Sequence, residues 1–139
     1  MVDRGSSSTL VLVLTTEANA NLAEGLANEL LARRLAACVS LQQIQSHYCW
    51  KGKLERAQEV QLLIKTSQDQ LDALHQTIKE LHSYETPEWI YWSATASDPY
   101  AAWVAAAVEP VEGRNSPLIS SDASLLIPEA TPVSEDRVE

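Results

Sequence analysis

Residues 37–66 read ACVSLQQIQSHYCWKGKLERAQEVQLLIKT, and this stretch predicts a β-hairpin that is longer than the core it belongs to. Lys51-Gly52-Lys53 supplies the turn between a strand that begins at Ala37 and a strand that runs to Thr66. The inner part of the second strand is apolar enough for a core, whereas the outer part of the hairpin is rich in Gln. Because an overhanging hairpin exposes unpaired strand edges, we expect it to meet a partner.

Strand and helix patterns alternate on both sides of this hairpin. Before it, residues 9–15 form a β-branched and Leu run typical of a central strand, and a Leu stripe predicts a helix over about residues 18–33. After it, a second helix is expected from Ser67, because Ser67 and Gln70 have the spacing of a capping box. A fourth strand is expected over residues 88–94.

A short third helix is expected after the fourth strand. Asp98 is the expected cap, Pro99 is a first-turn proline, and the Ala-rich stretch that follows runs to about Val108. The complete order is therefore βαββαβ with a short C-terminal helix. This order predicts a ferredoxin-like α+β fold, in which both crossover helices cover one face of a four-stranded antiparallel sheet.

The other face of that sheet also requires a cover. The large apolar side chains of the strands, which include Trp89, Tyr91, Val60 and Leu62, are more than two helices can hide. An apolar sheet face that stays open to water marks an association surface. Since closed symmetric homo-oligomers are the common solution, the sequence predicts self-association.

Length and composition suggest one domain with extensions at both ends. The 139 residues fit a domain over 9–108, an N-terminal arm over 1–8 and a tail over 109–139. The tail carries seven acidic and two basic residues, four prolines and no sustained period, so we expect it to be disordered.

Charge and hydropathy exclude several classes of partner. The net charge of −9, with ten dispersed Lys and Arg residues, argues against nucleic acid. No stretch approaches the roughly 18 apolar residues of a membrane-spanning helix, and the N-terminus lacks a secretion pattern. The two cysteines, Cys38 and Cys49, are then expected as reduced thiols. The sequence thus predicts a cytoplasmic protein without nucleic-acid or membrane partners.

Four short stretches follow one another along the chain: LAACV (35–39), YCWKGK (48–53), EVQLLIKT (59–66) and YETPE (84–88). In this order they resemble signature stretches of the CutA family of divalent-cation tolerance proteins. The resemblance covers about residues 9–108. It implies a homotrimer whose long hairpins pair between subunits, a fold shared with PII-type signalling proteins, and a link to copper and other divalent cations.

Cys38 and His82 are the candidate metal ligands, because a thiolate and an imidazole suit copper or zinc. The expected cofactor is therefore Cu²⁺ or another divalent cation. Tight sites usually need three or four ligands, so this pair alone is incomplete. The alternative for Cys38, which lies between Ala37 and Val39, is a small buried core residue.

The resemblance also implies a cleft between subunits, where the loop that carries Tyr84 and Glu88 lies alongside Trp50. Glu59 and Lys65 complete the candidate set for this cleft. These two charges are six residues apart on one strand, hence on the same face and about 20 Å apart, so they do not touch within one chain. We interpret the five residues as ligand-binding rather than catalytic.

The sequence contains no glycine-rich phosphate loop, nucleophile elbow or HExxH motif, which argues against an enzyme. The predicted function is that of a CutA-like, non-catalytic, trimeric binding and signalling module in the response to metal ions, with copper as a candidate ligand. The alternative is a PII-like small-molecule sensor, or a scaffold whose acidic tail recruits a partner, without physiological metal binding.

Overall fold

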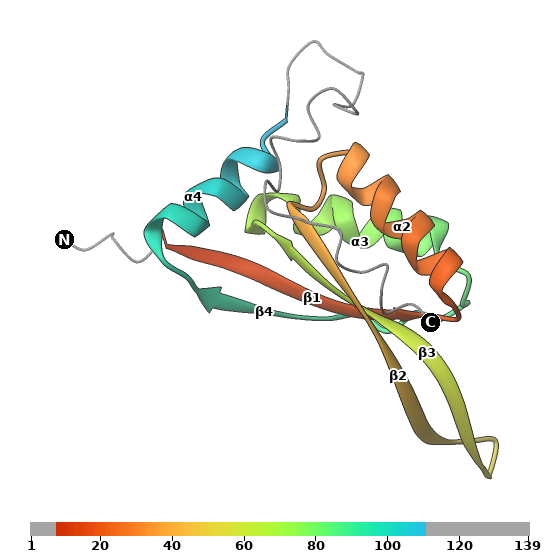
Figure 1. Cartoon of the computed structure of the whole chain (residues 1–139). Helices are drawn as coiled ribbons and strands as arrows, with labels where there is room; N and C mark the ends of the chain where they lie inside the picture. Colours follow the sequence, from red (N-terminus) through yellow and green to blue (C-terminus); the bar gives the residue numbers. More distant parts are fainter. Residues whose placement is uncertain (1–7, 111–139) are drawn as a thin grey trace, which may run out of the picture.

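The computed structural model describes residues 8–110 and contains one antiparallel sheet with the strand order β2-β3-β1-β4 (Figure 1). Its elements, in chain order, are β1 (Thr9–Glu17), α2 (Ala20–Ala32), β2 (Cys38–Trp50), β3 (Lys53–Thr66), the 3₁₀ turn η1 (Gln68–Gln70), α3 (Leu71–Leu81), β4 (Ile90–Thr95) and α4 (Asp98–Ala107). The predicted ferredoxin-like βαββαβ order with a short C-terminal helix is confirmed.

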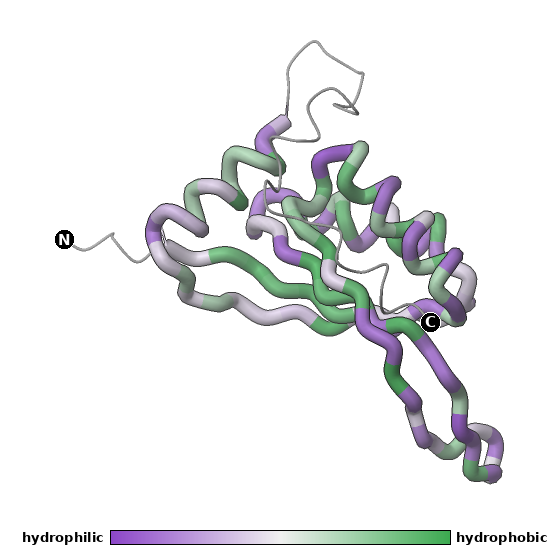
Figure 2. Tube along the Cα trace, in the orientation of Figure 1, coloured by the Kyte–Doolittle hydropathy of each residue, from purple (hydrophilic) through white to green (hydrophobic). Residues whose placement is uncertain are grey.

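The hairpin of β2 and β3 extends well beyond the helices (Figure 1), and Figure 2 shows that its outer half is mainly hydrophilic. The two strands pair without interruption from Cys38 opposite Lys65 to Trp50 opposite Lys53. At the tip, Lys51 and Gly52 have φ angles of 52° and 78°. Two consecutive left-handed residues define the tight turn whose twist matches the flanking strands. The turn therefore fixes the register of the whole hairpin.

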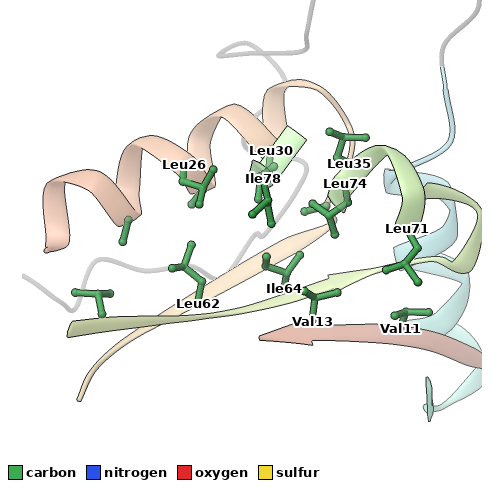
Figure 3. Close-up of a cluster of buried hydrophobic side chains, with 14 residues drawn as sticks. Val11, Val13, Leu26, Leu30, Leu35, Leu62, Ile64, Leu71, Leu74 and Ile78 are labelled. Carbon is green, nitrogen blue, oxygen red and sulfur yellow. The ribbon is translucent and has the colours of Figure 1, made fainter. Parts of the chain in front are cut away.

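The main core lies between the sheet and the helices α2 and α3 (Figure 3). Since side chains alternate along a strand, every second residue of β1 and β3 points to these helices. The fully buried side chains include Val13, Leu62 and Ile64 from the sheet, which meet Leu30 of α2 and Ile78 of α3.

The helix α4 covers one end of the opposite face. It contributes Val104 and Val108 to a second buried cluster with Leu10 of β1. Arg34, which has a left-handed φ of 59°, donates from Nε to the Glu109 carbonyl at 2.8 Å and from Nη2 to the Ala106 carbonyl at 3.2 Å. These two hydrogen bonds tie the loop between α2 and β2 to the C-terminal end of α4.

The rest of this face carries a patch of large apolar side chains that α4 does not reach. The register places Ile90 beside Leu14 and Leu14 beside Leu63. Trp92 is two residues further along β4 and therefore on the same face. Ile90 and Trp92 are 49% and 42% exposed. We call Leu14, Leu63, Ile90 and Trp92 the uncovered patch.

Three sequence expectations need correction. None of the four named side chains belongs to the open face: Val60 and Leu62 are buried under the helices, Trp89 packs against the same core, and Tyr91 pairs with the core residue Val13. The apolar excess comes from the uncovered patch instead. Ser67 and Gln70 form no capping box: neither side chain caps a helix, and Gln70 Nε2 donates to the Val108 carbonyl at 2.8 Å. The N-cap of α4 is Ser97, whose Oγ accepts from the Tyr100 N–H, rather than Asp98.

The predicted arm (1–8) and tail (109–139) lie almost wholly outside the described residues. Within the described range, no helix is both long and apolar enough to cross a membrane.

Candidate functional site

An open groove of about 900 Å³ lies between the outer hairpin and the loop that joins α3 to β4. Four of the five predicted cleft residues, Trp50, Glu59, Tyr84 and Glu88, line it. The other lining residues are Thr16, Ser46, His47, Tyr48, Glu55, Glu85 and Thr86. With four carboxylates and no Lys or Arg among these lining residues, we call this feature the acidic groove.

Glu59, which lines the acidic groove, accepts hydrogen bonds on both of its carboxylate oxygens. Its Oε1 accepts a hydrogen bond from Ser46 Oγ at 2.7 Å, and its Oε2 accepts one from the Tyr84 hydroxyl at 2.8 Å. Burial and this bond to Glu59 both raise the pKa of Tyr84, so the phenol stays protonated and remains a donor. The Glu59 carboxylate is therefore oriented by groups from β2 and from the loop.

Glu88 lies near enough to Glu59 for the two charges to interact. Burial raises the pKa of Glu88, and the negative charge of Glu59 raises it further. Like charges in a partly dry groove repel each other, and a bound cation would relieve that repulsion. The electrostatics of the acidic groove thus favour a positively charged ligand.

Lys65, the fifth predicted residue, lies outside the acidic groove. Its Nζ is 3.8 Å from Cys38 Sγ and 3.4 Å from Ser40 Oγ, on the neighbouring strand β2. As expected from their spacing, Glu59 and Lys65 do not meet. One chain therefore brings together Trp50, Glu59, Tyr84 and Glu88 but not Lys65.

His82 is buried and both of its ring nitrogens are occupied. Its Nδ1 accepts from the Tyr84 N–H at 3.0 Å, and its Nε2 donates to the Thr16 carbonyl. A metal ion requires a free lone pair on an imidazole nitrogen. In this arrangement His82 has none, so it serves as a structural link.

The two predicted metal ligands also lie apart. Cys38 pairs with Lys65, whereas His82 contacts Thr16, which pairs with Gln61. Four residues of strand separate these positions, about 13 Å at the usual rise. Metal–ligand bonds of roughly 2 Å cannot bridge that distance within one subunit. Among residues 8–110, no group of three or more His, Cys, Asp or Glu side chains could hold a metal ion.

Glu17 is a buried acid that sequence reasoning missed. Its side chain is 1% exposed and accepts hydrogen bonds from Ser83 Oγ at 2.6 Å, the Ser83 N–H at 3.0 Å and the Ala18 N–H at 3.0 Å. Burial opposes its ionisation, but the hydrogen bonds from Ser83 and Ala18 outweigh that effect and lower the pKa of Glu17. The only sign in the sequence was the position of Glu17, an acidic residue close to the end of a run of strand-forming apolar residues.

The remaining histidines differ from each other. His47 is exposed and lines the acidic groove. His75 is half-buried and stacks on Trp89 with ring centroids 4.1 Å apart and planes 8° apart. This stack anchors the far end of the loop from α3 to β4.

The fold and the acidic groove define a class of small ferredoxin-like domains with an open groove beside a long β-hairpin. Residues 11–107 match the family described as CutA1 divalent ion tolerance protein. The chain belongs to this family.

Relatives and solved structures agree with this membership. The divalent-cation tolerance protein CutA of Escherichia coli is 40% identical over 111 residues, which cover 78% of this chain and 99% of that protein. CutA from Synechococcus elongatus superposes with a TM-score of 0.71 at 38% identity, covering 73% of this chain and 92% of that one. The periplasmic divalent cation tolerance protein CutA from Archaeoglobus fulgidus superposes with a TM-score of 0.69 at 29% identity, covering 73% of this chain and 99% of that one.

Proposed function

We propose that this chain is a non-catalytic, homotrimeric binding and signalling module of the divalent-cation response, and that the acidic groove binds the cation. The observation that carries the proposal is the pair of carboxylates Glu59 and Glu88, which face one groove and repel each other. Cu²⁺ is the first ion to test, because His47 lines the same groove and imidazole with carboxylate suits this metal.

A single subunit offers an incomplete ligand set for this role. Within residues 8–110 no three ligand-type side chains converge, so water or groups from another subunit would complete the coordination. This requirement agrees with assembly. The uncovered patch supports self-association, since exposed apolar side chains that lie together on a sheet face are typical of interfaces. The number of three follows from the resemblance to the family.

Calorimetric titration of the full-length protein with Cu²⁺ tests the cation proposal. Glu59→Gln and Glu88→Gln should each weaken binding by about tenfold, because each removes one of the charges that attract the ion. Glu24→Gln, on the exposed surface of α2, is the matched control and should leave binding unchanged. Unchanged affinity in both groove variants, or no heat of binding in the unsubstituted protein, would contradict the proposal.

A second candidate function is a PII-like small-molecule sensor or scaffold without physiological metal binding. The size and lining of the acidic groove favour it, because about 900 Å³ with Tyr48, Trp50 and Tyr84 exceeds what one ion needs. The acidic lining selects organic cations over phosphorylated ligands. A melting temperature raised by spermidine but not by Cu²⁺ would favour this alternative.

We also propose a cytoplasmic location. The support is that Cys38 and Cys49 are both free thiols in the subunit, which suits a reducing compartment. The Archaeoglobus fulgidus relative is described as periplasmic, so the location requires its own test. Fractionation of cells that express the untagged protein would provide it.

A further inference from the structure

Glu17 and Ser83 contact each other next to the acidic groove: neither residue lines it, but their chain neighbours Thr16 and Tyr84 do. Ser83 follows His82, the C-cap of α3, and Glu17 is the last residue of β1, so the contact joins the loop to the sheet. Ser83 gives both of its donors, the backbone N–H and the hydroxyl, to one carboxylate. Ser83 itself is exposed, but the acceptor is almost completely buried.

A buried carboxylate strongly favours keeping all of its hydrogen bonds. Charge-assisted bonds of this kind are short and roughly twice as strong as neutral ones. Without the Ser83 hydroxyl, Glu17 Oε1 would keep only the Ala18 N–H, and the buried charge would lose the shortest of its three hydrogen bonds. The position of Ser83 relative to β1 is therefore tightly determined.

The next residue along the chain carries this constraint into the acidic groove. The Tyr84 N–H donates to His82 Nδ1, and His82 Nε2 donates to the Thr16 carbonyl, the residue before Glu17. The backbone of Tyr84 is thus fixed from both sides. Its hydroxyl then reaches Glu59 Oε2 at 2.8 Å.

We propose that the contact between Glu17 and Ser83 is a positioning device that fixes Tyr84 in place to orient the Glu59 carboxylate. Neither residue touches the ligand; both act through Tyr84. The consequence for cation affinity rests on the proposed function of the acidic groove. The positioning itself does not, and a measurement without any ligand tests it.

The test uses the full-length protein labelled with ¹³C at the tyrosine ζ carbon, whose NMR shift reports the hydrogen bond of each hydroxyl. Tyr84→Phe assigns the signal. Glu17→Gln and Ser83→Ala should both move the Tyr84 signal toward that of an exposed tyrosine. Ser83→Thr keeps both donors and should preserve it. Ser93→Ala, an exposed serine on β4, is the control and should change nothing.

An unmoved Tyr84 signal in both Glu17→Gln and Ser83→Ala would overturn the proposal, even if these variants were less stable. Calorimetry with Cu²⁺ on the same samples separates the two proposals. If the unsubstituted protein binds, Ser83→Ala should weaken binding by about tenfold, as is typical for groups that support metal ligands. If it does not bind but the Tyr84 signal moves, the proposed function fails and the positioning role stands.

Discussion

Trp92→Glu should separate the subunits while leaving each subunit folded. Trp92 is 42% exposed in one subunit, and a Trp side chain offers about 250 Å² to burial, so about 100 Å² remains in water. Covering that area in an interface would contribute about 2.5 kcal/mol per subunit at about 25 cal/mol per Å². A glutamate there forfeits this contribution and also has to be desolvated, which costs several kcal/mol more. Each contact should weaken by more than about 50-fold.

The assay is absolute mass by light scattering behind a sizing column, at several dilutions, with circular dichroism as a check on folding. The unsubstituted protein should give the mass of three chains and Trp92→Glu the mass of one. Tyr91→Glu is the matched control, because Tyr91 is 52% exposed on the same strand but points to the opposite face. A three-chain mass for Trp92→Glu at every dilution would refute the assignment of the uncovered patch to the interface.

Three further predictions concern the subunit itself, and all use urea denaturation at one fixed protein concentration. Leu62→Ala should lower the free energy of unfolding by about 2–5 kcal/mol, because Leu62 is completely buried between the sheet and the helices; a loss below about 1 kcal/mol would contradict the core assignment. Gly52→Ala should cost about 1–2 kcal/mol from its left-handed φ of 78° alone, since the added methyl group meets no atom within 4 Å; an unchanged midpoint would refute this. The lowered pKa of Glu17 should add stability above its unfolded pKa of about 4.3, and that stability should disappear as the pH falls through the folded value. Glu17→Gln should therefore reduce the loss of unfolding free energy at acidic pH. An equally steep loss in the variant would show that other carboxylates produce it.

The hairpin and the helix-covered face were predictable because local rules determine them. The hairpin was expected to begin at Ala37 and to end at Thr66, and in the structure β2 begins at Cys38 and β3 ends at Thr66. Lys51-Gly52 fixes the register at the tip, and alternation then assigns every side chain of β3 to a face. The start of β4 was expected two residues early. Trp89 stacks on His75 there instead of continuing the strand.

The acidic groove was predictable only in part, because its support depends on contacts between distant segments. Trp50, Glu59, Tyr84 and Glu88 belong to stretches that resemble a known family, and all four line one groove. Glu17 and Ser83 are 66 positions apart, and nothing in either local pattern indicates that they meet. Cys38 and His82 were paired because their side chains suit the same metals. Ligand chemistry carries no information about distance, and the two residues lie too far apart to share a metal within one subunit.

Alternation along β3 also places the acidic groove and the uncovered patch on the same face of the sheet. The residues Val60, Leu62 and Ile64 point to the helices, so Glu59 and Leu63 necessarily share the opposite face. Glu59 belongs to the acidic groove and Leu63 to the uncovered patch, and the two are about 13 Å apart along one strand. If another subunit covers Leu63, it must also border the groove. A cation that binds the assembled form more tightly than the single subunit would then stabilise assembly by the same factor, because coupling free energies are reciprocal.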